Sequence, residues 1–493
     1  MTTRRKDTGK PGNGGMFDPV RRGESSKITL DSSVPLIDVT PATQRVLDAL
    51  TDIGGHPLMV GGCVRDALLG DKHPKDVDIE VYGIETSDVV ASLRKVGRVD
   101  EVGSSFVMTK VLVDGEDFDV ALPRTERKTG EGHRDFEVIA DPHASTEVAS
   151  ARRDFTINAM MYDPATGLVI DHWGGRRDLR DGILRHVSDK FDEDPLRVMR
   201  AARFAGRFNM QVHPDTAAYC RAISDKYGTI SADRVWKEWR RMAGEGTSMT
   251  ASLKALVDTG WIEHFPELAV LRDVPQDPRW HPEGTVWDHT GQAADKAIEF
   301  CKAAGIDGEE REIVVLATLC HDFGKAEYTQ IEADENGETR IHSRGHAEGG
   351  VKPVREFLHG MDAPHHVIGK VEKLVEHHMD SVDMPVKPRP AVVRKLMRNL
   401  APATLDQWLL VRRADRAGRG AASVDPDVSG WKAVELDEGP KMKPLLTGDH
   451  LIAAGMRPGP AFRPILEDAL NAQDEGVFDD EVGALAWFTD RIR

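Results

Sequence analysis

The chain has 493 residues, of which 40% are hydrophobic and 30% are charged. This length exceeds what one hydrophobic core usually organises, so we expect about two to four globular domains. The sequence has no apolar run of the ~18 residues that cross a membrane and no secretory signal, which excludes a membrane partner and predicts a cytoplasmic protein.

The charge balance restricts how the chain can meet nucleic acid. Its formal net charge of -17 at pH 7 excludes a surface coated with cations, because phosphate neutralisation requires Lys and Arg. Residues 176–207 and 394–419 are locally rich in these cations; each stretch is either a basic track or an ordinary solvated helix face. The cysteines have no paired spacing, so the sequence predicts neither disulfides nor a zinc motif.

The chain begins with a segment that is unlike the rest. Residues 1–35 are polar and rich in Gly, Ser and charge, a composition typical of disorder. After them, the hydrophobic pattern predicts a helix at residues 43–51 and a strand at residues 58–60.

The most informative motif reads VGGCVRDALLGDKHPKDVDIEVYG. Gly61 and Gly62 allow a close approach of the backbone to phosphate, and the Arg65 guanidinium suits phosphate oxygens. Asp76 and Asp78 alternate with apolar residues as in a strand, so both face the same side. Adjacent carboxylates repel unless a cation such as Mg²⁺ lies between them. By itself, a Gly-Gly pair usually indicates a turn, and an Asp-x-Asp strand usually indicates a solvated face. The pattern becomes specific because the glycines, Arg65 and the two aspartates follow one another in this order.

This order resembles the first motif of the class II nucleotidyltransferases, the family of the CCA-adding enzymes and bacterial poly(A) polymerases. In that family the motif runs GG-x-VRD-x-LLG and then DxD. The resemblance implies that Asp76 and Asp78 are catalytic and hold Mg²⁺, and that Gly61, Gly62 and Arg65 bind the nucleotide.

A helix and a hairpin are predicted next. The helix covers residues 87–96, and the arms of the hairpin are residues 106–113 and 118–122. Asp114-Gly115 is a typical two-residue hairpin turn.

Asp119 in the second arm has two interpretations. Either it joins Asp76 and Asp78 as a third catalytic carboxylate, or it is an ordinary surface residue of a strand. Residues 124–141 are polar and poorly periodic, which predicts a mobile loop.

Residues 152–159 read RRDFTINA and match a motif of the same family at every position. By its chemistry, Arg153 can bind phosphate, and Asp154 can accept hydrogen bonds from a ribose hydroxyl. Without the motif, an Arg–Asp surface pair would be the simpler interpretation.

The chain becomes helical after residue 176. Asp194 before Pro195 predicts an N-cap followed by a proline at the first helical position, and helical spacing brings Arg197 within reach of Asp194. The motif resembles the family's ED-x-x-R, which implies that Asp194, Arg197 and Arg200 select the base: a carboxylate accepts from the amino group of cytosine or adenine and repels the carbonyl of guanine or uracil. The alternative is a capping aspartate beside a row of surface arginines.

Residues 233–238, reading DRVWKE, resemble the next motif of the family, whose Arg and Glu brace the neck beside the base-reading helix. We expect Trp236 and Trp239 to lie in the core. Residues 275–283 contain prolines and are predicted to be a linker.

A second candidate metal site follows the linker. It combines imidazoles and carboxylates on apolar helices: His289, His321, Asp322, His346, His378 and Asp415. This is a ligand set for a divalent transition metal with open positions for water. We favour His378 over His377 for its place after Glu376.

This series resembles the HD-type phosphohydrolases. The resemblance implies an activated water that attacks a phosphoester, either to remove a phosphate or to open a 2′,3′-cyclic phosphate at an RNA end. The alternative is an inactive domain that serves as an all-α scaffold.

The resemblance spans residues 58–466 and implies an α+β fold. The expected parts are the disordered extension 1–35, a nucleotidyltransferase palm 36–175 with a mixed sheet and helices, and then all-α segments: a neck 176–274, an HD domain 275–425 and a helical tail 426–493. The implied activity is untemplated addition of CCA to tRNA from CTP and ATP. The alternatives are a poly(A) polymerase or a partial CC- or A-adding enzyme, an HD phosphohydrolase whose palm merely binds nucleotide, and a noncatalytic RNA-binding module.

Overall fold

The computed structural model describes residues 36–74, 76–101, 108–128, 136–333, 335–381, 384, 386–420, 426–438 and 443–492. The predicted disorder of residues 1–35 and the start of the first hairpin arm lie outside these ranges. The chain divides into two compact units, Met1–Pro123 with Ala140–His143 and Met161–Ile170, and Arg124–Ile139 with Ala144–Met160 and Asp171–Arg493. The domain boundaries expected at residues 175, 274 and 425 stay predictions.

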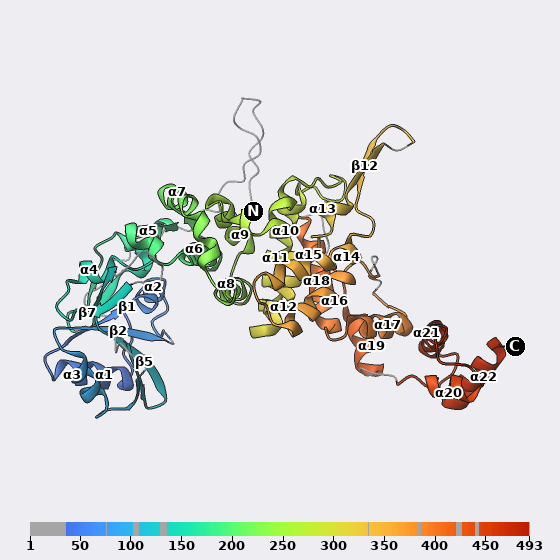
Figure 1. Ribbon diagram of the computed structural model, residues 1–493, viewed down its shortest axis with the longest axis horizontal. Coiled ribbons are helices and arrows are strands. Elements are labelled where there is room, and N and C mark those ends of the chain that lie inside the picture. Colours follow the sequence, from blue (N-terminus) through green and yellow to red (C-terminus); the bar gives the residue numbers. More distant parts are fainter. Residues whose placement is uncertain are drawn as a thin grey trace. The chain divides into compact units, whose positions relative to one another are not determined.

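A seven-stranded sheet in the order β3-β4-β5-β2-β1-β8-β9 forms the first unit (Figure 1). Its strands are β1 His56–Val60, β2 Val77–Tyr82, β3 Arg98–Glu101, β4 Met108–Val113, β5 Glu116–Ala121, β8 Met161–Asp163 and β9 Leu168–Ile170. The pair β2 and β5 is parallel, whereas the other neighbouring strands are antiparallel. The expected mixed sheet is therefore present.

Three helices accompany this sheet: α1 Pro41–Thr51, α2 Gly62–Leu68 and α3 Thr86–Leu93. Helix α1 begins after Thr40, whose hydroxyl accepts from the Thr43 N–H at 3.0 Å, and it contacts α3. Val46 and Leu50, one turn apart on α1, are fully buried, as an amphipathic helix requires.

The predicted hairpin is confirmed over β4 and β5. Its turn residues Asp114 and Gly115 have φ of 52° and 86°, the left-handed conformation that a tight two-residue hairpin turn requires. Phe118 and Val120 of β5 are buried, so Asp119 points to the opposite face of the sheet.

The mobile loop predicted for residues 124–141 is wrong over most of its described part. β6 Arg124–Lys128 and β7 Phe136–Ala140 form a two-stranded sheet. The polar sequence RTERK has no hydrophobic alternation that would indicate a strand. Residues 129–135 lie outside the described ranges.

The second unit is mostly helical. Its first part contains α4 Thr146–Ser150, α5 Gly175–Asp181, α6 Arg197–Phe208, α7 Pro214–Ala222, α8 Ala232–Glu245, α9 Met249–Asp258 and α10 Pro266–Ala269, with the short parallel pair β10 Ile183–Leu184 and β11 Gln211–Val212. Trp236 and Trp239 of α8 are buried, as predicted. Two ion pairs of 2.7 Å tie α8 to residues earlier in the chain: Arg234 pairs with Asp194, and Glu238 pairs with Arg203 of α6.

The later helices are α11 Val286–Ala303, α12 Gly308–Cys320, α13 Lys325–Tyr328, α14 His346–Gly349, α15 Val351–His359, α16 His365–Glu376, α17 Pro390–Leu400 and α18 Leu405–Gly418. Helices α11, α12, α16 and α18 pack against one another. A hairpin of β12 Gln330–Ala333 and β13 Thr339–His342 extends from this helical body (Figure 1).

The tail consists of α19 Ser429–Glu438, α20 Gly448–Ala453, α21 Phe462–Asp474 and α22 Glu481–Ile492. Leu451, Phe478 and Phe488 contribute to its small apolar core, and the buried Asp474 pairs with Arg398 at 2.5 Å. None of the helices in the described part of the chain combines the length and the hydropathy that crossing a bilayer requires.

The buried Arg203–Glu238 pair yields a stability prediction. Burial lowers the pKa of Arg203 to about 10, which shows how much the guanidinium depends on its partner. Glu238→Ala leaves this cation buried and unpaired, and we expect it to lower the free energy of unfolding by about 3–5 kcal/mol. Urea denaturation followed by circular dichroism measures the loss.

The control is Lys237→Ala, which breaks the exposed Lys237–Asp233 pair on the same helix. We expect that change to cost no more than about 0.5 kcal/mol. Equal losses for the two variants would contradict the role assigned to the buried pair.

Candidate functional sites

The first candidate site is a group of carboxylates on the sheet. Asp78 on β2 lies directly opposite Asp119 on the parallel strand β5, so the two side chains project from the same face. Asp78 is exposed, and Asp76, two residues before it, is exposed as well. The structure therefore brings Asp119 beside Asp78, as one of the two interpretations of Asp119 requires.

Lys110 of β4 belongs to the same face and was missed by the sequence analysis. Its ammonium lies 3.1 Å from a carboxylate oxygen of Asp119. The contact with Asp119, together with the charges of Asp117 and Asp78, raises the pKa of Lys110. The face is thus acidic enough to attract a cation.

Glu80 continues the alternation of Asp76 and Asp78 in sequence but differs from them in burial. It is 1% exposed, and the Tyr82 hydroxyl donates a hydrogen bond of 2.5 Å to its carboxylate. This acid is part of the core and not of the exposed face.

The glycine pair lies where β1 turns into α2. Gly61 has φ of 77°, a conformation that favours glycine, and α2 begins at Gly62. Arg65 on this helix is 4% exposed, and its guanidinium donates to both carboxylate oxygens of Asp66 at 2.8 and 2.9 Å. Its expected contact with phosphate stays a prediction.

The RRDFTINA segment places Asp154 inside the second unit. The Asp154 carboxylate accepts from Arg200 at 2.6 and 2.8 Å and from Asn158 at 2.9 Å. Burial by itself would raise the pKa of Asp154, but Arg200 and these hydrogen bonds lower it. Asp154 thereby fixes the guanidinium of Arg200, whereas Arg153 is half-buried and its role stays a prediction.

Asp194 and Arg197, which were expected to contact each other, each bind a different partner. Asp194 accepts from Arg234 at 2.7 Å, and Arg197 donates to the carbonyl oxygens of Lys190, at 2.6 Å, and Arg152. Helix α6 begins at Arg197 and not directly after Asp194, because a tight turn from the Asp194 carbonyl to the Arg197 N–H comes first.

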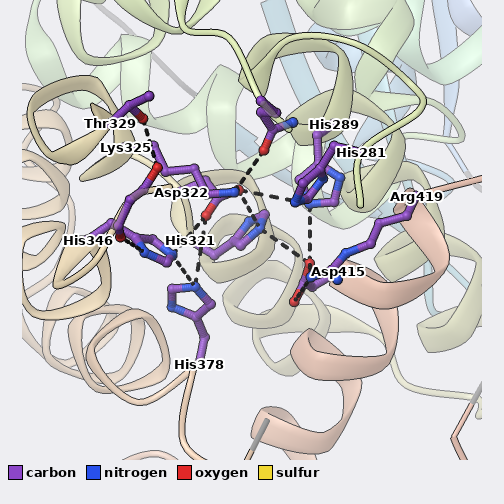
Figure 2. A network of polar contacts seen from close by, with 12 residues as sticks. His281, His289, His321, Asp322, Lys325, Thr329, His346, His378, Asp415 and Arg419 are labelled. Carbon is purple, nitrogen blue, oxygen red and sulfur yellow. Dashed lines mark hydrogen bonds and ion pairs between the residues drawn. The ribbon is translucent and has the colours of Figure 1, made fainter. Parts of the chain in front are cut away.

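The second candidate site is the histidine–aspartate cluster, defined as His289, His321, Asp322, His346, His378 and Asp415. These residues come from α11, the end of α12, the start of α14, the end of α16, and α18. All of them are buried, and their side chains point toward one another (Figure 2). The structure thus brings every expected ligand together.

Two groups of potential ligands share Asp322. One carboxylate oxygen lies 3.2 Å from His321 Nε2 and 3.9 Å from His289 Nε2. The other lies 3.2 Å from His346 Nε2 and 3.9 Å from His378 Nε2. Asp415 lies beside the first group, 3.2 Å from His289 Nε2. Each group has the spacing of a metal site.

The opposite ring nitrogens show which atoms face the centre. Nδ1 of His321, His346 and His378 lies 2.6–2.7 Å from a backbone carbonyl oxygen. A carbonyl only accepts, so each Nδ1 carries the proton and each Nε2 offers a lone pair. Three lone pairs converging on a shared carboxylate are the arrangement of a metal centre.

The burial of these atoms supports the same conclusion. His321 Nε2 is buried without a hydrogen-bond partner, which is costly unless an ion satisfies it. Burial by itself would raise the pKa of Asp322, but His321 and Lys325 lower it well below its usual range. Burial lowers the pKa of His378 far below its usual value. The donor set therefore fits a divalent metal.

His377, the neighbour of His378, lies outside the cluster. Its Nδ1 is 3.1 Å from Asp380, and its carbonyl oxygen accepts from the Trp408 indole at 2.8 Å. The choice of His378 as the candidate ligand agrees with this placement.

The predicted linker, residues 275–283, is part of this site. Glu283 lies 2.8 Å from Nδ1 of both His281 and His289, so it orients His289 as a carboxylate partner. Gln276 accepts from Lys325 at 2.7 Å. No periodic pattern marks these residues, because irregular backbone carries them.

Three cations beside the aspartates were also missed, although helical spacing indicates them. Lys325 follows Asp322 by one turn and lies 2.8 Å from it. Arg412 and Arg419, one turn before and after Asp415, each approach it to 3.0 Å. These pairs are typical of i, i+3 and i, i+4 contacts.

Comparison with known proteins gives matches in both halves of the chain. The family model of the Poly A polymerase head domain matches residues 58–185, and that of the HD domain matches residues 286–417. The multifunctional CCA protein of Nitrosococcus oceani is 34% identical over 407 residues, covering 81% of this chain and 93% of the relative. The multifunctional CCA protein of Xanthomonas campestris pv. campestris is 35% identical over 371 residues, which cover 73% of this chain and 85% of the relative.

Solved structures agree in fold. The CCA-adding enzyme of Bacillus stearothermophilus in complex with CTP is similar with a TM-score of 0.59 and 22% identity, covering 92% of this chain and 98% of that one. The Thermotoga maritima CCA-adding enzyme complexed with tRNA is similar with a TM-score of 0.54 and 20% identity, and the match covers 91% of this chain and 94% of that one. At these identities the likeness concerns the fold, which confirms the expected α+β class.

The two adjacent histidines allow a test of the metal centre. We expect His378→Ala to lower the content of divalent transition metal measured by mass spectrometry after dialysis, because one converging lone pair is lost. His377→Ala is the matched control and should keep the wild-type content. An equal loss in both variants would contradict the placement of the site.

Glu283 provides a second test. Glu283→Gln keeps the shape of the side chain but removes the charge that supports His289, so metal affinity should fall by about 10- to 100-fold. Competition with a chelator measures this change. Glu348 is an exposed carboxylate at the same pocket, and Glu348→Gln should leave the metal affinity unchanged. An unchanged affinity in Glu283→Gln as well would contradict the role of Glu283 in supporting His289.

Proposed function

Since this chain belongs to the family of the multifunctional CCA proteins, we propose that it adds the C-C-A sequence to the 3′ end of tRNA from CTP and ATP. The addition needs no nucleic-acid template. The observation that carries this proposal is the register of β2 and β5, which sets Asp78 beside Asp119 on an exposed face next to Asp76. tRNA is the proposed partner, and we place the activity in the cytoplasm.

The proposed reaction is an in-line displacement at phosphorus. The terminal hydroxyl of the RNA attacks the α-phosphorus of the nucleotide, the bond from that phosphorus to the bridging oxygen breaks, and pyrophosphate leaves. Asp76 and Asp78, with Asp119, are the residues that would hold Mg²⁺, which lowers the pKa of the attacking hydroxyl and neutralises the leaving oxygens. Gly61, Gly62 and their neighbour Arg65 are the proposed triphosphate-binding residues of the first unit, and Arg153 is a proposed phosphate-binding residue of the second.

Asp194, Arg197 and Arg200 are the proposed base-selecting residues of the second unit. The Asp194 carboxylate would accept from the amino group of cytosine or adenine, while the arginines donate to ring and carbonyl acceptors. Arg234 and Asp154 hold Asp194 and Arg200 in place. We infer that this bracing makes the selecting atoms rigid, because each already has one fixed partner.

The histidine–aspartate cluster supports a second activity, phosphohydrolysis. Its residues would hold a divalent transition metal, which supplies an activated water. Such a water would serve the hydrolysis of a phosphoester, either to release phosphate or to open a 2′,3′-cyclic phosphate. Glu283 keeps His289 oriented, and Lys325 keeps Asp322 ionised.

Stepwise nucleotide incorporation tests the main activity. Pure protein is incubated with tRNA that lacks its 3′ end, with CTP and ATP singly and together. We expect C-C after CTP alone and a stop after C-C-A with both nucleotides. Long A tracts would instead indicate a poly(A) polymerase, and a stop after C-C or addition of A alone would indicate a partial enzyme.

Two substitutions separate the two activities. We expect Asp78→Ala to lower nucleotide incorporation by roughly 10²- to 10³-fold, because charge stabilisation at the transition state is lost, while cyclic-phosphate hydrolysis persists. His321→Ala should do the reverse. Asp52→Ala, an exposed carboxylate at the end of α1 in the same unit, is the control for incorporation. Full incorporation by Asp78→Ala would overturn the proposal in favour of a phosphohydrolase with a nucleotide-binding palm.

A further inference from the structure

An exposed tryptophan lies at the pocket that opens onto the histidine–aspartate cluster. Trp280 is 69% exposed, although an indole of this size normally buries most of its surface. The pocket has a volume of about 550 Å³, and it is lined both by Trp280 and by Asp322, His346, His378 and Asp415. One continuous cavity therefore joins the aromatic ring to the candidate metal centre.

The backbone that carries Trp280 is well fixed. The N–H groups of Trp280 and His281 donate to the Asp277 carbonyl oxygen at 3.0 and 2.9 Å. The His281 ring in turn contacts Glu283, which contacts His289. The segment is thus tied to the cluster through two side chains, so the backbone that carries the indole needs little further ordering when a ligand binds.

The size and chemistry of the pocket favour a ligand larger than phosphate. Its volume lies in the range of pockets for small organic ligands, whereas a phosphate alone would occupy only the part near the cluster. Lys325 and Arg419 add positive charge beside the aspartates, and Arg344 is exposed at the same pocket. Cations and an exposed aromatic ring that line the same pocket match a nucleoside phosphate, whose base has a flat face.

We propose that Trp280 stacks on the base of the terminal nucleotide whose phosphate is hydrolysed at the cluster. This inference rests on the proposed phosphohydrolase activity and adds a residue that sets its specificity, Trp280, which would bind the base of the substrate. For a 2′,3′-cyclic phosphate, water oxygen bonds to phosphorus, one bond from phosphorus to a ribose oxygen breaks, and that oxygen takes a proton. Trp280 contributes to substrate binding and not to the chemical step.

The test compares two cyclic phosphates on the metal-loaded full chain. Adenosine 2′,3′-cyclic phosphate carries a base, and glycerol 1,2-cyclic phosphate does not. We expect Trp280→Ala to lower kcat/KM for the adenosine substrate by about 5- to 150-fold, mainly through KM, as loss of one base stack implies. Hydrolysis of the glycerol substrate should change less than about 2-fold, because its contacts lie at the cluster.

Two further variants separate stacking from a general loss of structure. Trp280→Phe keeps an aromatic face and should retain most of the preference for the adenosine substrate. Ile331→Ala removes another exposed apolar side chain, 61% exposed on β12 and outside the pocket, and should change neither rate. Equal losses for both substrates in Trp280→Ala, or no loss for either, would overturn the inference.

A binding measurement distinguishes failure of this inference from failure of the proposed hydrolysis. Calorimetric titration with adenosine 2′-monophosphate compares the wild type with Trp280→Ala, so binding elsewhere on the chain is common to both. One outcome is that the wild type hydrolyses neither ester while Trp280→Ala binds adenosine 2′-monophosphate more weakly than the wild type. That outcome would contradict the proposed hydrolysis and support the stacking. Equal affinities with neither ester hydrolysed overturn both.

Discussion

The burial of carboxylates beside cations is the constraint on which this structure depends. A carboxylate removed from water is costly unless hydrogen bonds or opposite charge compensate it. In the second unit Asp154 is compensated by Arg200, and Glu238 by Arg203. Asp415 meets Arg412 and Arg419 on its own helix. Each compensation also fixes the direction of a side chain, so the energetic requirement produces the ordered geometry that recognition needs.

The two candidate centres use different solutions to the same problem. On the sheet, Asp78 and Asp119 stay near water, where their mutual repulsion is screened. In the cluster, Asp322 and Asp415 are buried, so His289, Lys325 and the converging imidazoles surround them. An exposed acidic face suits a hard cation that keeps its waters, whereas a buried nitrogen-rich set suits a transition metal.

The sequence patterns indicated which residues are candidates for chemistry, but they were poorer at indicating which residues contact them. Strand alternation placed Asp78 on an exposed face, but the adjacency of Asp119 depends on a parallel pairing of strands far apart in the chain. Helix spacing suggested that Arg197 meets Asp194, yet Arg234 of a distant helix takes that position, because a tertiary partner outcompetes a local one. Glu283 went unrecognised because irregular backbone has no period to reveal it.

The arginines of residues 394–419 have a further consequence for how the molecule meets a polyanion. The stretch contains seven Lys or Arg, but Arg394 and Arg398 meet Asp474, Arg412 and Arg419 meet Asp415, and Arg413 lies over the Phe300 ring. Five of these charges are therefore committed within the fold. They would release few counterions to a bound polyanion, so this segment would add little to the dependence of such binding on ionic strength.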